Sequence, residues 1–287
     1  MSTLGSFLRP DGYVRPHPAA VARELRIVAE AGRYAARTRR DRRTRRAVSW
    51  TERAHPRTGD PVILVPGFMA GDGTLSLLAA ALRREGLRTY RSEIHANVGC
   101  TLEASTLLET RLEAIAIRRG TRVQVVGHSL GGLLARGLAV RRPDLISGIV
   151  TLGSPLMAPA AHHVSLTAMI ELLNRLSRAG VPGLMAEDCV AGTCALTSFT
   201  ESRQPMPEGV RFTSVWSPND GVVDPASCLD PEARQVEVAA SHCGMAVDPR
   251  VRDVVVRALR AGSAQGSASE GPAPEGSVLE VDRGVGA

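Results

Sequence analysis

Three residues of this 287-residue chain have the types and the order needed for nucleophilic acyl chemistry, namely Ser129, Asp220 and His242. A serine hydroxyl is a poor nucleophile until a histidine removes its proton, and the histidine needs a carboxylate that orients its ring. Ser129 is the centre of a Gly-x-Ser-x-Gly pattern that runs from Gly127 to Gly131. These side chains predict a reaction through an acyl-serine intermediate.

The sequence around Ser129 predicts a strand, a tight turn and a helix. Residues 121–136 read T-R-V-Q-V-V-G-H-S-L-G-G-L-L-A-R, so a β-branched run precedes the serine and a Leu/Ala-rich run follows it. This pattern is typical of a nucleophile elbow, in which the serine projects from a strained turn. Glycines two residues to either side let the strand and the helix pass close to each other.

The acid and the base are expected in loops that follow two later strands. S-P-N-D-G-V-V follows an expected strand at 210–216 and contains Asp220, whereas S-H-C-G-M follows an expected strand at 235–239 and contains His242. This gives the chain order serine, acid, histidine that is found in enzymes whose serine lies on a nucleophile elbow. Asp224 is the alternative acid, although its place before a proline is more typical of a turn or a helix cap.

The other histidines are expected to have structural roles. His128 lies inside the elbow, where the side chain before the serine points into the fold, so we expect it to pack there. His162 and His163 are expected to form an exposed pair or to lie at the rim of a pocket, because adjacent histidines rarely converge on one metal.

The negative charge that develops on a substrate oxygen needs preorganised donors, usually two backbone N–H groups. Leu130 directly follows the serine at the expected start of a helix, where the helix dipole also favours negative charge. Phe68 lies in the loop after the apolar run P-V-I-L-V-P at 61–66 and is the expected second donor, with Met69 as the alternative.

Short apolar runs alternate with helical patterns between residues 61 and 152, and this alternation predicts an α/β fold with a mostly parallel sheet. The helix expected at 102–119 has Leu107, Leu108 and Leu112 on its buried stripe. Further strands are expected at 61–66, 87–94 and 145–152, a strand, elbow and helix at 122–141, and a closing helix at 249–259.

Three regions surround or interrupt the expected catalytic domain at 61–260. Residues 1–60 are expected to form an N-terminal amphipathic helix, from about 19 to 36 with Val21, Leu25 and Val28 on one face, and a basic linker. An insertion at about 156–207 has helical stretches and no convincing strand, which indicates an apolar lid or, alternatively, ordinary helix packing. Residues 261–287 are rich in Gly, Ser, Ala and Glu and are expected to form a disordered tail.

The net charge of +6 is concentrated in one segment. Between Arg37 and Arg46 the chain has seven arginines and one aspartate, so the rest of the chain is neutral overall. A solvated helix end explains this run, and weak contact with an anionic membrane is the alternative. No nucleic-acid partner is expected, because no aromatic residue for base stacking lies in the run.

The five cysteines are expected to be reduced thiols of a cytoplasmic protein. The N-terminus does not resemble a signal peptide, and no apolar run approaches the ~18 residues of a membrane span. Metal-type Cys-x-x-Cys pairs are absent from the sequence, and we expect no metal or cofactor. A disulfide between Cys228 and Cys243, or between Cys189 and Cys194, and the oligomeric state stay open.

The motifs resemble those of the α/β-hydrolase superfamily, in particular its serine lipase/esterase branch and the actinobacterial lipase-like hydrolases. The resemblance extends from about residue 61 to 259 and rests on V-P-G-F, N-V-G-C, G-H-S-L-G-G, L-G-S-P, N-D-G-V-V and S-H-C-G-M. It implies an α/β-hydrolase fold with a helical lid or cap. It also implies that Ser129 is the nucleophile, Asp220 the acid and His242 the base, with Phe68 and Leu130 as oxyanion donors.

The resemblance implies hydrolysis of carboxylic esters with lipid-like acyl groups. An acyltransferase or thioesterase that uses the same acyl-enzyme is the alternative, since it would share every motif. Pro66 departs from the His-Gly found in many lipases. Some bacterial lipases hold calcium through an aspartate soon after the catalytic histidine, but here Cys-Gly-Met follows His242, so we expect no calcium.

Overall fold

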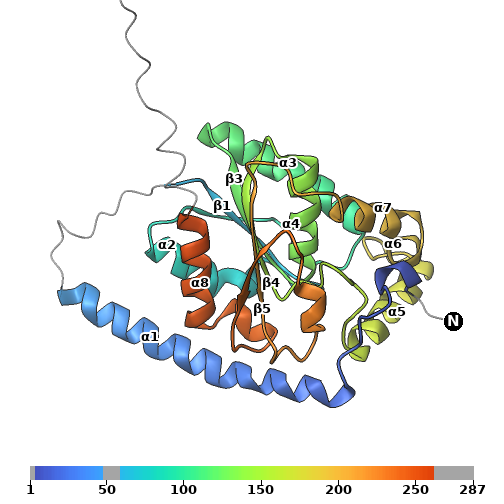
Figure 1. The fold of residues 1–287 in the computed structure, drawn as a ribbon, viewed down its shortest axis with the longest axis horizontal. Coiled ribbons are helices and arrows are strands. Elements are labelled where there is room, and N and C mark those ends of the chain that lie inside the picture. Colours follow the sequence, from blue (N-terminus) through green and yellow to red (C-terminus); the bar gives the residue numbers. More distant parts are fainter. Residues whose placement is uncertain (1–3, 48–58, 262–287) are drawn as a thin grey trace, which may run out of the picture.

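A parallel six-stranded sheet forms the centre of the structure, a computed structural model that describes residues 4–47 and 59–261 (Figure 1). The strand order is β2-β1-β3-β4-β5-β6, and each neighbouring pair is parallel. The strands are β1 (Val62–Val65), β2 (Thr89–Arg91), β3 (Val123–His128), β4 (Ile146–Leu152), β5 (Arg211–Trp216) and β6 (Arg234–Glu237). The α/β class and the parallel sheet expected from the sequence are confirmed.

Helices cover both faces of this sheet (Figure 1). On one face α2 (Ser76–Arg84) and α8 (Pro249–Arg260) pack on Val62 and Leu64, and on the other α3 (Thr101–Arg119) and α4 (Leu130–Arg141) pack on Ile63 and Val65. Successive side chains of a strand point to opposite faces, so a continuous apolar run such as β1 is buried on both sides. The carboxyl ends of the strands therefore meet at one edge, where the loops of the candidate site begin.

Two local predictions in this domain were wrong. The strand expected at 87–94 ends at Arg91, because the Asp72 carboxylate accepts hydrogen bonds from the amides of Ser92 and Glu93 and Glu93 has a φ of 69°. Leu107 is 72% exposed, since the buried stripe of α3 passes through Leu108 and Leu112, one position further along the helix.

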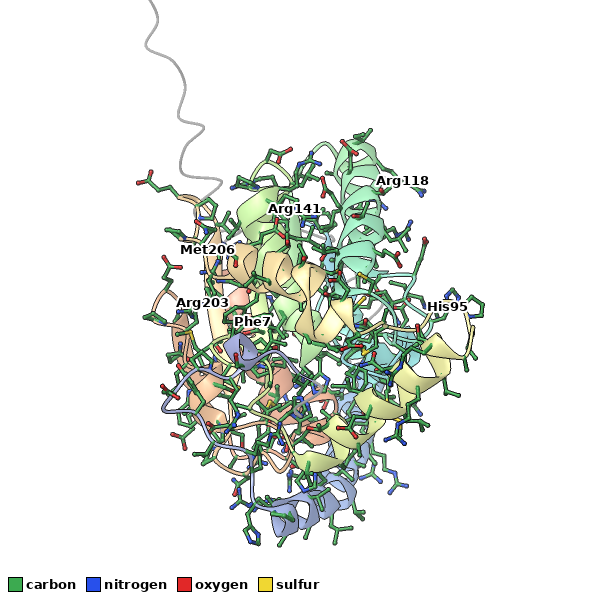
Figure 2. All side chains as sticks on the ribbon, turned by 90° about the vertical axis from the view of Figure 1, so that its right-hand side faces the viewer. Phe7, His95, Arg118, Arg141, Arg203 and Met206 are labelled. Atoms are coloured by element: carbon green, nitrogen blue, oxygen red, sulfur yellow. The ribbon has the colours of Figure 1, made fainter. Side chains whose placement is uncertain are left out.

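The insertion is helical and packs with the first described residues of the chain. It contains α5 (Val164–Arg178), α6 (Asp188–Ala191) and α7 (Thr193–Ser202). The amide of Gly5 donates to the carbonyl of Val190 at 3.0 Å, and the ring centroids of Phe7 and Phe199 are 6.2 Å apart. Figure 2 shows Phe7 beside the helices of this insertion. We call residues 156–207 the cap; its action as a lid stays a prediction.

The N-terminal segment differs from its prediction. A 3-10 helix, η2 (Pro18–Arg26), leads directly into α1 (Ile27–Ala47), which runs along one side of the molecule beside α8 (Figure 1). Val21, Leu25 and Val28, expected on one face of an amphipathic helix, are 45%, 75% and 74% exposed, so they do not pack against the sheet domain. The buried residue of α1 is instead Glu30, whose carboxylate binds the loop after β6, as described below.

The arginine run between residues 37 and 46 is part of α1 rather than of a linker. Arg39, Arg40, Arg42 and Arg43 are exposed, and membrane contact through them stays a prediction. Within the described residues, no helix has the length and apolar character that a membrane crossing requires. The rest of the expected linker (48–58) and the expected tail from residue 262 lie outside the described residues.

Candidate active site

Ser129 lies at the turn between β3 and α4, as the sequence predicts. Its φ of 53° and ψ of −121° are a strained conformation for a residue with a side chain. The turn is tight, because a Cβ atom at Gly127 would lie 2.4 Å from the carbonyl oxygen of Gly131. A Cβ atom at Gly131 would lie 2.2 Å from the carbonyl oxygen of Val65 on the neighbouring strand. Neither Gly127 nor Gly131 therefore has room for a side chain.

Asp220 and His242 are brought together by the loops after β5 and β6. The Oδ2 atom of Asp220 accepts a hydrogen bond from Nδ1 of His242 at 2.7 Å, and both side chains are buried. The Oδ1 atom of Asp220 accepts from the amides of Val222 and Val223, each at 2.8 Å, which fixes the carboxylate in place. A carboxylate bound in this way orients the imidazole and stabilises its protonated form.

The alternative acid, Asp224, has a structural role in the described residues. Its Oδ1 atom accepts from the amide of Ala226 and caps the short helix η5 (Pro225–Cys228), and its Oδ2 atom accepts from the amide of Val14. The carboxylate is therefore directed toward backbone amides, while Asp220 faces His242.

Gly153, at the end of β4, lies between the serine and the acid–base pair. A Cβ atom at Gly153 would lie 3.1 Å from both Asp220 Oδ2 and His242 Nδ1. The preceding carbonyl, that of Leu152, accepts a hydrogen bond from the amide of Ser129 at 2.9 Å. Among the hydrogen bonds of the described residues, none joins the hydroxyl of Ser129 to His242; catalytic bonds of this kind often tighten only when substrate is bound.

The surroundings of His242 favour its protonated state. Burial lowers the pKa of the imidazole, but the charge of Asp220, the hydrogen bond to it and the charge of Glu24 together raise this pKa above the ordinary value of 6.5. A base with a raised pKa takes up the proton of a serine hydroxyl more readily.

His128 supports the loop of His242 and is itself kept neutral. Its Nε2 atom donates to the carbonyl oxygen of His242 at 3.0 Å, and the two rings are 4.9 Å apart. Burial and the neighbouring His242 lower the pKa of His128 to about 4. The expected packing role of His128 therefore includes a hydrogen bond that holds the base loop.

The two amides expected to bind an oxyanion are located at the serine. A Cβ atom at Gly67 would lie 3.0 Å from Cβ of Ser129, so the loop after β1 touches the nucleophile, and Leu130 begins α4. The amide of Met69 donates to the carbonyl of Asn97 at 3.0 Å, which removes it as the alternative donor. No hydrogen bond among the described residues uses the amide of Phe68 or that of Leu130.

Asn97 holds the loop after β1, which contains Phe68, and was not recognised from the sequence. Its side-chain Nδ2 donates to the carbonyl of Pro66 at 3.0 Å, its amide donates to the carbonyl of Ala70, and its carbonyl accepts from Met69. The residue is buried. The N-V-G-C motif was the signal that could have indicated this role.

Glu24 was also missed, and it binds both loops that contain Asp220 and His242. Its Oε1 atom accepts from the amides of Gly221 at 3.0 Å and His242 at 2.9 Å, and its Oε2 atom accepts from the amide of Cys243 at 2.9 Å. Glu30 adds two bonds, from the amide and the hydroxyl of Ser241. No motif marks these glutamates, which lie about two hundred residues before their partners.

An apolar pocket that is open to solvent adjoins Ser129. Phe68 and Leu130 lie in its wall, and further apolar side chains come from the N-terminal segment and from the cap, including Leu8, Ile170, Met185 and Phe199. His162 lines the same pocket and is buried. His163 is also buried and donates to the carbonyl of Pro18, so the first alternative, an exposed pair, was wrong, while the position of His162 fits the second, a place at the pocket.

The described residues contain one group of three metal-type side chains, and it is not at the serine. The Sγ atoms of Cys100, Cys189 and Cys194 all lie within 4.8 Å of one another. All five cysteines are free thiols in the structure.

Comparison with known proteins supports the fold and its likeness to lipases. Residues 56–187 match the family model described as a PGAP1-like alpha/beta domain. A triacylglycerol lipase of Vibrio cholerae serotype O1 is 25% identical over 108 residues, which are 36% of this chain and 35% of the relative. A triacylglycerol lipase of Pseudarthrobacter phenanthrenivorans is 28% identical over 104 residues, 33% of each chain. The chain thus spans about a third of the length of these curated relatives.

Among solved structures, the mature form of the Bacillus licheniformis lipase BlEst2 is similar in fold, with a TM-score of 0.57 and 15% identity. The similarity covers 71% of this chain and 94% of that chain. The parallel sheet, the serine at its elbow and these matches identify the chain as an α/β-hydrolase-fold protein similar to lipases and esterases.

Proposed function

We propose that this chain is a serine hydrolase that cleaves carboxylic esters with apolar acyl groups. The observation that carries the proposal is the strained Ser129 beside a buried Asp220–His242 pair. The similarity to triacylglycerol lipases supports the ester class, and the apolar pocket at Ser129 supports a hydrocarbon acyl chain.

In the proposed reaction, Nε2 of His242 removes the hydroxyl proton of Ser129 while Oγ attacks the acyl carbon. The amides of Phe68 and Leu130 bind the oxygen that becomes negative. The protonated His242, held by Asp220, then gives its proton to the leaving alcohol as the ester C–O bond breaks. Water attacks the acyl-enzyme with His242 again as base, which releases the carboxylic acid and restores the Ser129 hydroxyl.

A chain-length series of p-nitrophenyl esters and acyl thioesters, run with wild type and Ser129→Ala, tests this proposal. We expect turnover of esters by the wild type, with a preference for longer acyl chains, and loss of at least about 10³-fold in kcat for the variant. Equal turnover by both proteins would contradict it. Acylation of Ser129 without release of acid, followed by transfer to an added alcohol or thiol, would replace hydrolysis by acyl transfer.

A further inference from the structure

Three cysteines from separate elements meet where the cap joins the sheet domain. Cys100 is the residue immediately before α3, Cys189 belongs to α6 and Cys194 belongs to α7. Their Sγ atoms lie within 4.8 Å of one another, and those of Cys100 and Cys194 are 3.0 Å apart. This last pair is separated by 94 positions in the sequence, so the fold rather than local sequence brings it together.

The two nearest thiols are held firmly by their helices. Asp188 accepts from the amide of Thr193 at 2.8 Å and from that of Cys194 at 3.1 Å, and thereby fixes the start of α7. Cys100 lies at the amino end of α3, where unpaired backbone amides favour a negative sulfur. Neither sulfur needs a change of fold to approach the other.

The two thiols also differ in acidity. Burial raises the pKa of Cys100, but hydrogen bonds from Cys194 and from the backbone of Glu103 outweigh it, so the pKa is lowered overall. Burial and the neighbouring Cys100 raise the pKa of Cys194 to about 12. Cys100 is thus the more readily ionised of the pair, which suits an attacking thiolate.

We propose that Cys100 and Cys194 are an oxidation site that forms a reversible disulfide between the sheet domain and the cap, with a small-molecule disulfide as oxidant. The Cys100 thiolate attacks one sulfur of the oxidant, whose S–S bond breaks, and the first thiolate leaves. The sulfur of Cys194, losing its proton, then attacks Cys100 Sγ in the mixed disulfide, and the second small thiol leaves. Two protein thiols are oxidised and one small disulfide is reduced to two thiols.

The position of this pair gives the disulfide a defined consequence. Cys100 follows Asn97 by three residues, and the carbonyl of Val98 accepts from the amide of Met185 in the cap. Cys189 and Ala195, the neighbours of Cys194 in the cap, line the pocket at Ser129. A covalent link therefore fixes the cap against the segment that holds the loop after β1; its effect on catalysis rests on the proposed function, whereas its formation does not.

The test is disulfide mapping of the full chain after incubation with oxidised glutathione, alkylation and non-reducing tryptic digestion. Cleavage after arginine leaves Cys100 in peptide 92–111 and both cap cysteines in peptide 179–203. We expect these peptides to be joined in the wild type and in the matched control Cys189→Ser, and to be separate in Cys194→Ser and Cys100→Ser. Reduction with dithiothreitol should separate them again.

Three outcomes would overturn the proposal. In one, all five thiols of the oxidant-treated wild type remain open to alkylation. In another, the link persists in Cys194→Ser and vanishes in Cys189→Ser, which would place the disulfide between Cys100 and Cys189. In the third, the purified protein holds one equivalent of zinc that protects the three thiols until a chelator removes it, which would make the cluster a metal site. Since no outcome depends on ester turnover, a failure here leaves the proposed function untouched.

Discussion

At the scale of single residues, the carboxylate of Asp220 fixes the orientation of the His242 imidazole, which is the base of the proposed reaction. Its two oxygens are fully used, one by the imidazole and one by two amides. The sequence predicted that these two residues lie in the loops after two late strands, because a Gly or Pro marks the turn after each strand, and the structure joins them by a hydrogen bond; their catalytic roles stay a proposal. It could also separate Asp220 from Asp224, since a cap residue before proline has its own recognisable pattern.

Replacing Asp220 by Asn should lower kcat by about 10³- to 10⁴-fold, because the amide no longer holds the reactive tautomer of His242. The matched control is Asp224→Asn, which changes the same group four residues away. Steady-state kinetics on one ester checks both variants. If circular dichroism shows that both variants are folded and Asp224→Asn loses more activity, then Asp224 rather than Asp220 is the acid.

The rate should also depend on pH through His242. The base acts only when neutral, and its pKa is raised above 6.5 by Asp220 and Glu24 against the effect of burial. Activity should therefore be full on the alkaline side and fall as the pH drops through this raised pKa. A profile of kcat/KM against pH measures this pKa as the midpoint of the acidic fall in activity. A midpoint below pH 6.5 would contradict a raised pKa of His242.

At the scale of elements, the loops of the site are held by segments far from them in sequence. The strands and helices could be predicted from periodicity, because burial on a sheet leaves a regular pattern. The supports of the loops could not, because a glutamate that accepts amide hydrogen bonds looks like any surface glutamate. The contacts of the N-terminal segment could not be predicted for the same reason: the segment binds through Glu24 and Glu30, while the apolar Val21, Leu25 and Val28 are exposed.

Replacing Asn97 by Ala should lower kcat by about 10²-fold with little change in KM, since the loop that carries the Phe68 amide loses its anchor at Pro66. The loss should appear with short and long esters alike. A thermal melt accompanies the kinetics, and an unchanged kcat in a folded variant would remove Asn97 from the oxyanion machinery.

Glu24 should act as a positioning residue with a measurable electrostatic effect. In Glu24→Gln the charge near His242 is lost and an amide replaces an acceptor of three backbone bonds, so kcat/KM should fall and the acidic limb of the pH profile should move to lower pH. The control is Glu208→Gln, an exposed glutamate outside these loops. An unshifted limb in a folded Glu24→Gln protein would show that the role is structural only.

At the scale of the whole molecule, the N-terminal segment packs against the loops of the candidate site, whereas composition predicted a helix and a basic linker up to residue 60. It contributes carboxylates to one side of the site and apolar residues, including Leu8, to the pocket. Composition could not reveal these contacts, because the arginine run makes the segment as a whole look charged and solvent-exposed.

Removing residues 1–47 should therefore abolish ester turnover and lower the Tm, even though Ser129, Asp220 and His242 all remain. The measurement is a thermal melt and a kinetic assay of the chain that starts at residue 48, beside the full chain. Adding a peptide of residues 1–47 should restore part of the activity. If the truncated protein had the same kcat/KM as the full chain, the N-terminal segment would not be needed for catalysis.

The bonds of Glu24 also impose an order on the synthesis of the molecule. Glu24 and the amide of His242 are 218 positions apart, so at about 5–20 residues per second the ribosome adds the second roughly 10 to 40 s after the first. The strand and turn that carry Ser129 are complete long before that. A nascent chain thus contains Ser129 long before His242, and on the proposed function it could attack esters only after its last strands have emerged and packed against η2.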